Sequence, residues 1–163
     1  MDLPKQLAKE QIEADVREAL QRESISLCAG SEISIPILEL TPELREAIFY
    51  AKILGEVTIG YDPIEKRLLH ELRGLQKVGN QGERVSRLLI VTNDGSPRFY
   101  RELEFLRKKQ GGRVMICRLD TGSVSMGDIL GLKETSVKAV LLNRKTSVVN
   151  VLRSLSGKKA AEG

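Results

Sequence analysis

The first 55 residues show two helical patterns of apolar positions with an extended segment between them. Residues 4–22 carry one apolar stripe, which predicts a helix that is otherwise polar. The stripe consists of Leu7, Ile12, Val16 and Leu20. Alternating isoleucines at positions 33, 35 and 37 predict extended chain. Thr41 and Pro42 then supply the N-cap and first residue of a second helix, which we expect Gly55 to end.

The remainder alternates between short apolar runs and helical patterns. Residues 57–59, 87–92, 113–117 and 137–142 are the runs, and they predict strands. Helices are predicted from Ser96 and Pro97 to Gly111, and over residues 146–155. This alternation predicts an α/β protein, a three-layer α/β/α sandwich with a small mixed central sheet. We divide the chain into an N-terminal extension (1–39), this domain (40–156) and a disordered tail (157–163).

The junction after the strand at 57–59 combines a glycine, an aromatic residue and a carboxylate. Gly60 permits a positive backbone dihedral, and Asp62, Pro63 and Glu65 form an aspartate version of a capping box at the start of a helix. The glycine-rich segment 74–86 predicts an exposed loop. Its sequence lacks the lysine and hydroxyl residue with which a phosphate-binding P-loop ends.

Charge is distributed unevenly along the chain. Residues 1–46 hold 5 Lys and Arg against 10 Asp and Glu, a net charge of −5, which leaves +9 for the rest of a chain whose total is +4. Residues 84–118 contain nine basic side chains against three acidic ones. Such asymmetry is typical of a protein with a polyanionic partner, and also of an ordinary solvated surface. The stripe on the acidic N-terminal helix favours contact with another protein.

The order of these segments resembles that of a known RNA-binding family. From Leu40 to Leu155 the chain is similar to the kink-turn RNA-binding superfamily of ribosomal and small nucleolar ribonucleoproteins, the L-seven-Ae and L-thirty-e group. A ribonuclease P/MRP protein subunit of the same fold is a comparable candidate. The matching segments are "LGEVTIGYDPIEK", "LLIVTNDGSP", "GGRVMIC" and "SMGDILGLKETSVKAVLL".

The resemblance implies two RNA contacts. Gly60 matches the glycine that lets the backbone approach RNA, Asp62 and Pro63 stand where the family has Asn and Glu, and Lys66 matches a lysine. The carboxylate of Asp62 donates no hydrogen bonds and Pro63 has no group that reads a base, which departs from kink-turn recognition. The second contact is a loop of Thr121, Gly122, Ser123 and Val124 against a flipped-out nucleotide. Tyr61 could stack on a base or cover the core, and the side chains that could follow the RNA backbone are Arg84, Arg87, Arg98 and Arg101.

Three functions stay open on the sequence. We expect a noncatalytic component of a ribonucleoprotein that binds structured RNA, needs no cofactor or metal, and meets other subunits through residues 1–39. The second is a metal-dependent nuclease of the PIN or NYN class, and its candidate ligands are Asp62, Asp94, Asp120 and Asp128. The third is a protein-interaction module without RNA readout. The lone His70 lacks partners for catalysis, and the spacing of Cys28 and Cys117 suggests no disulfide framework or zinc site. These features, with no long apolar stretch, favour a reducing intracellular setting, cytoplasmic or nuclear, without a membrane.

Overall fold

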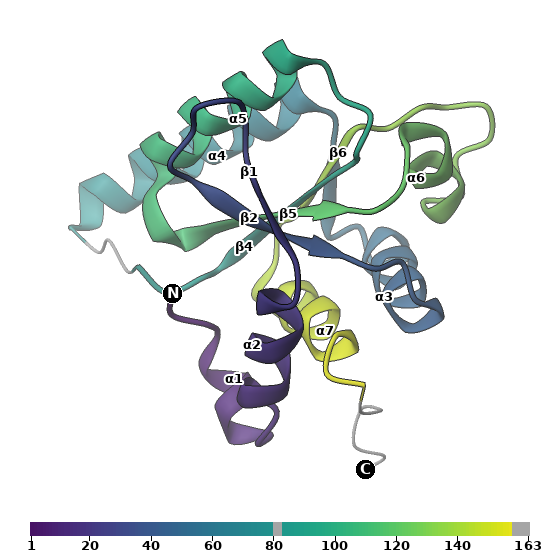
Figure 1. Ribbon diagram of the computed structural model, residues 1–163. Helices are drawn as coiled ribbons and strands as arrows, with labels where there is room; N and C mark the ends of the chain where they lie inside the picture. Colours follow the sequence, from purple (N-terminus) through teal and green to yellow (C-terminus); the bar gives the residue numbers. More distant parts are fainter. Residues whose placement is uncertain (80–82, 158–163) are drawn as a thin grey trace.

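A single mixed sheet organises the chain in the computed structural model, which describes residues 1–79 and 83–157 (Figure 1). Its strand order is β1-β2-β5-β4-β6-β3. The strands are β1 (Ser24–Ser26), β2 (Ser34–Leu38), β3 (Val57–Ile59), β4 (Arg87–Val91), β5 (Val114–Leu119) and β6 (Ala139–Leu142). Strands β2, β5 and β4 are parallel, whereas β6 runs antiparallel to both β4 and β3. The predicted mixed α/β architecture is therefore confirmed.

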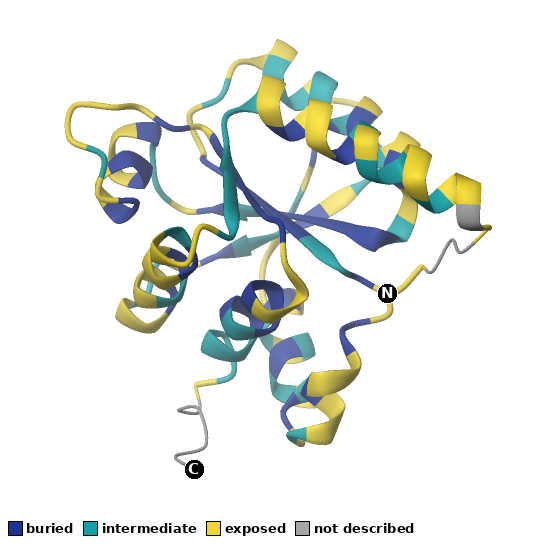
Figure 2. Cartoon of the chain, turned by 180° about the vertical axis from the view of Figure 1, so that it is seen from behind, coloured by how far each residue is buried: buried dark blue, intermediate teal, exposed yellow. Residues whose placement is uncertain are grey.

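Helices cover both faces of this sheet. They are α1 (Lys5–Lys9), α2 (Glu13–Gln21), α3 (Pro42–Ile53), α4 (Tyr61–Val78), α5 (Pro97–Gln110), α6 (Ser123–Ile129) and α7 (Lys145–Ser154), with a short 3-10 turn η1 (Gly111–Arg113). Helices α4 and α5 pack on one face, and α1, α2, α3, α6 and α7 share the core on the other (Figure 1). Buried residues line the sides of α4 and α5 that face the sheet, and exposed residues cover their outer sides (Figure 2).

The strands serve both cores because their side chains alternate between the two faces. In β4, Leu88 and Ile90 join the core beneath α7, whereas Leu89 and Val91 join the core beneath α4 and α5. All four side chains are fully buried. A continuous apolar run is therefore what a central strand with helices on both faces requires.

The two predicted helix starts with a hydroxyl cap are confirmed. The Oγ1 atom of Thr41 accepts a hydrogen bond from the backbone N–H of Leu44 at the start of α3. At the start of α5, the Oγ atom of Ser96 accepts one from the N–H of Phe99. Each hydroxyl satisfies an N–H group that has no partner within the helix itself.

Two predictions around α4 are wrong. The helix begins at Tyr61 with Gly60 as its N-cap, and among the described residues no side chain caps it, so Asp62 does not form a capping box. The predicted loop over residues 74–86 starts too early, because α4 continues to Val78 and ends at Gly79, which has a left-handed backbone with φ 66°. A glycine within a helix lowers its stability without ending it, which explains the misplaced boundary at Gly74. Residues 80–82 of that loop, and residues 158–163 of the predicted tail, lie outside the described residues.

The N-terminal 39 residues are built into the core. The predicted single helix is two, α1 and α2, separated at Gln11 by a positive φ of 61°. The stripe side chains Leu7, Ile12, Val16 and Leu20 are at most 5% exposed and pack in the core beneath α7. Strand β2 pairs with β5, and Glu10 holds Arg153 of α7 through two contacts of 2.7 Å. The expectation that the stripe contacts a partner protein is thus corrected, because its own chain covers it.

Candidate nucleic-acid interface

Three segments that the sequence associated with RNA meet at one edge of the sheet. Strands β3, β4 and β5 end there and β6 begins there, so the segments 60–62, 92–98 and 120–124 lie along it; we name these three segments the carboxyl edge. Backbone hydrogen bonds connect them: the N–H of Gly60 donates to Ala139 O, that of Thr92 to Lys138 O, and that of Asn93 to Thr121 O, at 2.9 to 3.0 Å. The first and second predicted contacts therefore belong to one continuous edge.

Gly60 has the positive φ that the sequence predicted. Its φ of 90° and ψ of 148° lie in a region that L-residues with a side chain rarely occupy, while its carbonyl accepts the N–H of Ile64 and starts α4. Asp62 and Lys66 are exposed on the first turns of that helix. The two side chains bring opposite charges to the same helix start.

Tyr61 is held within the protein rather than presented to solvent. Its hydroxyl donates to a carboxylate oxygen of Glu65 at 2.7 Å, and its ring packs edge-on against Phe99 with 6.2 Å between centroids. Burial, followed by the neighbouring Glu65 carboxylate, raises the pKa of the hydroxyl above its usual value. Of the two roles that the sequence left open, covering the core is the one that this geometry provides.

Asp94 fastens the loop after β4 to the start of α6. Its carboxylate accepts hydrogen bonds from Thr92 Oγ1 at 2.7 Å, from the backbone N–H of Ser123 at 2.9 Å and from Ser123 Oγ at 2.8 Å. The bond from the Ser123 backbone is the main cause that lowers the pKa of Asp94 from 3.8 to about 2. A Cβ at Gly122 would lie 3.3 Å from the same carboxylate, so this approach favours glycine. The sequence analysis had considered Asp94 only as a metal ligand.

Tyr100 fixes the other side of that loop. Its hydroxyl accepts the N–H of Gly95 at 3.0 Å and donates to Thr92 O at 2.8 Å. The segment 92–95 is therefore constrained from α5 as well as from α6. In the loop 121–124, Ser123 is buried, Thr121 and Gly122 are half-buried, and the side chain of Val124 is 67% exposed. Val124 is thus the apolar side chain that this loop presents to solvent.

The four predicted arginines fall into two groups. Arg98 lies in the first turn of α5 at the carboxyl edge, 82% exposed and 3.3 Å from Glu102, and Arg101 is exposed one turn further on. Arg84 and Arg87 lie at the other end of β4, where Arg84 Nη1 donates to Leu3 O and Arg87 Nε donates to Glu71. The structure therefore does not bring Arg84 and Arg87 together with the other candidates.

Arg118 is a candidate that the sequence analysis missed. It lies near the end of β5, opposite Val91 of β4 and Ile37 of β2, and is half-buried. Its Nε atom is buried and has no hydrogen-bond partner within the described part of the chain. Residues 114, 116 and 118 lie on the same face of β5, and the first two, Val114 and Ile116, are buried in the core. A cation at the third position is the signal that could have identified Arg118.

The aspartates do not form the metal centre considered from the sequence. Asn93 Nδ2 donates to Asp120 at 3.4 Å, Asp94 is occupied by Thr92 and Ser123, and Asp62 lies exposed on α4. Across residues 1–79 and 83–157, no group of three or more His, Cys, Asp or Glu side chains could hold an ion. None of the helices in those ranges is long and apolar enough to cross a membrane.

Within the described residues, the fold is an α/β/α sandwich built on a mixed six-stranded sheet. No protein-family model matches the chain, and no curated protein matches it in sequence. Among solved structures it is similar to the Giardia lamblia 15.5kD RNA binding protein, with 15% sequence identity and a TM-score of 0.50. The match covers 71% of this chain and 82% of the Giardia chain. At this identity the likeness confirms the fold that the sequence resemblance predicted.

Proposed function

We propose that this protein is a noncatalytic component of a ribonucleoprotein and binds structured RNA at its carboxyl edge. The supporting observation is the hydrogen-bonded row that joins Gly60, through Ala139, Lys138 and Thr92, to the loop that ends at Val124. It brings the start of α4 and the exposed apolar side chain of Val124 to one edge, where α5 also begins, while the start of α6 is already occupied by the Asp94 carboxylate. Helix starts favour phosphate oxygens, and an apolar side chain can pack against an unstacked base.

The charge of this edge determines how it can bind RNA. Lys66, Arg98 and Arg101 are exposed there and can neutralise phosphates. Asp62 lacks the donors of an asparagine amide and repels phosphates, so its side chain cannot read bases as the matching asparagine of kink-turn binders does. The proposal therefore assigns affinity to the cations and base contact to Val124, since the N–H groups of Thr121 and Ser123 already donate to Leu119 O and to Asp94.

Neutralising the two arginines of α5 tests this interface. In Arg98→Ala/Arg101→Ala we expect affinity for a structured RNA at physiological salt to fall by roughly fivefold for each phosphate contact, and the salt slope to decrease by about two. The measurement is fluorescence anisotropy of a labelled RNA hairpin over a salt series.

The matched control is Lys108→Ala/Lys109→Ala at the other end of α5. Each pair removes two positive charges and one exposed i,i+4 ion pair, Arg98 with Glu102 or Lys108 with Glu104. The RNA affinity of the control variant should stay within about a factor of two of wild type if contacts at the carboxyl edge dominate. Equal losses in the two pairs would mean that α5 binds RNA only through its total charge, and the proposed interface would be wrong.

Asp62→Asn tests the same edge in the opposite direction. The amide removes a negative charge next to the proposed phosphates and adds two donors, so RNA affinity should rise several-fold. Val124→Ser tests the apolar contact, and Phe105→Ser is its control. Both remove an exposed apolar side chain, 67% exposed for Val124 and 73% for Phe105, and only Val124 lies at the carboxyl edge. An Asp62→Asn protein with unchanged affinity would count against RNA contact at the start of α4.

The remaining parts of the proposal are the setting and the partners. Cys28 and Cys117 are free, and burial raises the pKa of the Cys117 thiol to about 12, so that thiol stays protonated and inert. Free thiols fit the reducing intracellular setting expected from the sequence. Other ribonucleoprotein subunits stay part of the proposal, although the buried stripe of residues 1–39 is not the surface that would bind them.

A further inference from the structure

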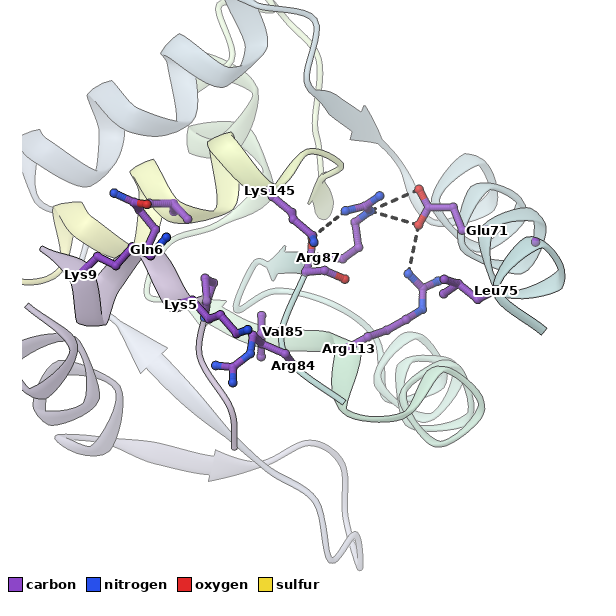
Figure 3. Close-up of a pocket in the computed structure, with 14 residues that line it drawn as sticks. Lys5, Gln6, Lys9, Glu71, Leu75, Arg84, Val85, Arg87, Arg113 and Lys145 are labelled. Carbon is purple, nitrogen blue, oxygen red and sulfur yellow. Dashed lines mark hydrogen bonds and ion pairs between the residues drawn. The ribbon is translucent and has the colours of Figure 1, made fainter. Parts of the chain in front are cut away.

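A basic pocket lies at the edge of the sheet opposite the carboxyl edge (Figure 3). Its volume is about 780 Å³, and it is lined by residues from α1, α4, the start of β4, η1 and α7. Its six cationic residues are Lys5, Lys9, Arg84, Arg87, Arg113 and Lys145. Among the described residues that line it, Glu71 is the only carboxylate, which leaves a net charge of +5. No feature of the carboxyl edge accounts for this concentration of charge.

Two arginines form the inner wall of the pocket and share one counter-ion. Glu71 Oε1 accepts from Arg87 Nε and from Arg113 Nη1, each at 3.1 Å, and Figure 3 shows the carboxylate between them. The Arg113 side chain is 6% exposed, and its Nε atom is buried without a hydrogen-bond partner in the described ranges. One negative charge facing two guanidinium groups leaves an excess positive charge in a poorly solvated position, where a bound anion gains most.

Three lysines surround this wall from two helices. Lys5 and Lys9 lie one turn apart on α1, and Lys145 is the first residue of α7. All three are exposed, and among the described residues none forms an ion pair. The start of α7 is not an additional anion site, because the Glu56 carboxylate already accepts hydrogen bonds from Thr146 Oγ1 and Ser147 Oγ in its first turn. The pocket thus places three lysines without an ion pair among the described residues around the two arginines that share Glu71.

We infer that this pocket binds backbone phosphates of a second RNA segment, so that one molecule holds two segments at opposite edges of its sheet. The inference rests on the proposed function of the carboxyl edge. The lining favours a phosphate backbone over a base or a nucleotide, because the described residues that form it include no aromatic ring for stacking. Contacts from lysine and arginine to phosphates position nucleic acid and do not select its sequence.

A bridging assay tests the pocket. One RNA hairpin is immobilised, the full-length protein is added, and capture of a second, fluorescent hairpin is measured. The pocket variant is Lys5→Gln/Lys9→Gln/Lys145→Gln, and the matched control Lys77→Gln/Lys108→Gln/Lys109→Gln removes the same number of charges from the C-terminal turns of α4 and α5. We expect capture by the pocket variant to fall on the order of a hundredfold, for three lost phosphate contacts, and the control to keep most of it.

The outcomes separate this inference from the proposed function. If the pocket variant bridges as well as the control, the pocket is not an RNA site, and the carboxyl edge stands. Arg98→Ala/Arg101→Ala should also lose bridging, and the pocket should hold the one hairpin that still binds, at the lower affinity predicted above. If that variant binds and bridges normally, the proposed interface at the carboxyl edge fails instead. A wild-type protein that binds pyrophosphate by calorimetry but bridges no RNA would have a site for a small phosphate ligand, which would overturn the RNA assignment.

Discussion

The hydrogen bonds of Asp94 predict how strongly its charge stabilises the carboxyl edge. The perturbation is Asp94→Asn, which keeps the size of the side chain and removes the charge that accepts from Thr92 and from both the N–H and the hydroxyl of Ser123. An amide keeps one acceptor oxygen, which can still accept from Ser123, and turns an NH₂ group toward Thr92 Oγ1, whose hydroxyl must then give up its bond to this side chain. The loop after β4 and the start of α6 should therefore lose part of their connection.

The lowered pKa of Asp94 gives the size of the expected loss in the free energy of unfolding. A shift from 3.8 to about 2 means that folding favours the ionised form, and at about 1.4 kcal/mol for each tenfold change in proton affinity it corresponds to roughly 2.5 kcal/mol. Asp94 is exposed, and solvent screens such interactions, so we expect about 1 kcal/mol of the free energy of unfolding to depend on this charge. Because the folded pKa is depressed, this contribution is present above pH 3.8 and is lost as the pH falls toward about 2.

Urea denaturation of both proteins near pH 7 and near pH 3 measures the effect. Asp94→Asn should be less stable than wild type by about 1 kcal/mol near neutrality, and the difference should shrink in acid, because the wild-type carboxylate begins to protonate while the amide does not titrate. Asp62→Asn is the control, since Asp62 is exposed and makes no hydrogen bond within the described residues; its stability should be unchanged. A difference that is equal at both pH values would refute the role of the Asp94 charge.

Three further predictions concern core packing and a buried ion pair. A Cβ at Gly127 would lie 1.8 Å from Thr135 O, so Gly127→Ala should lower the free energy of unfolding in urea by about 2 kcal/mol or more. Gly74→Ala, with open space on α4, should raise it by roughly 0.5 to 1 kcal/mol. The reverse order would contradict the packing around α6. Leu7→Ala should cost about 2 to 5 kcal/mol by thermal unfolding, and an unaffected melting temperature would mean that α1 is not part of the core. Glu71→Gln leaves a buried guanidinium without its counter-ion and should cost roughly 3 kcal/mol in urea, less when sulfate is present; a loss that sulfate does not reduce would count against anion binding in the pocket.

The elements of the sheet could be read from the sequence because their signals are local. Strand β3 spans the predicted residues 57–59, and α3 and α5 begin at the predicted hydroxyl caps, Thr41 and Ser96. In each case a short run of apolar residues or a single capping side chain determines the element. The position of Gly60 at a helix start could be predicted for the same reason, since its positive φ follows from its place between a strand and a helix.

The errors lie where distant parts of the chain decide the outcome. An apolar stripe on an acidic helix looks the same in sequence whether it faces a partner protein or its own core. The pairing of β2 with β5 is what shows that residues 1–39 are part of the same sheet and core. Asp94 could not be recognised as a clamp, because its acceptor role depends on Ser123, 29 residues later in the chain. Arg84 and Arg87 are close to Arg98 in sequence, yet β4 carries them to opposite edges. Charge counted along the chain therefore identified a basic region without locating it.

The two proposed RNA sites differ in charge. The carboxyl edge mixes Lys66, Arg98 and Arg101 with exposed Asp62 and Asp94, so phosphate attraction there is partly cancelled, whereas the basic pocket has a net charge of +5. Since base contacts supply specificity and phosphate attraction does not, the two proposals together assign selective binding to the edge that bears Val124 and an additional nonspecific contact to the pocket. High salt should then weaken binding at the pocket more than at the carboxyl edge, and bridging should be lost at a lower salt concentration than the binding of a single hairpin.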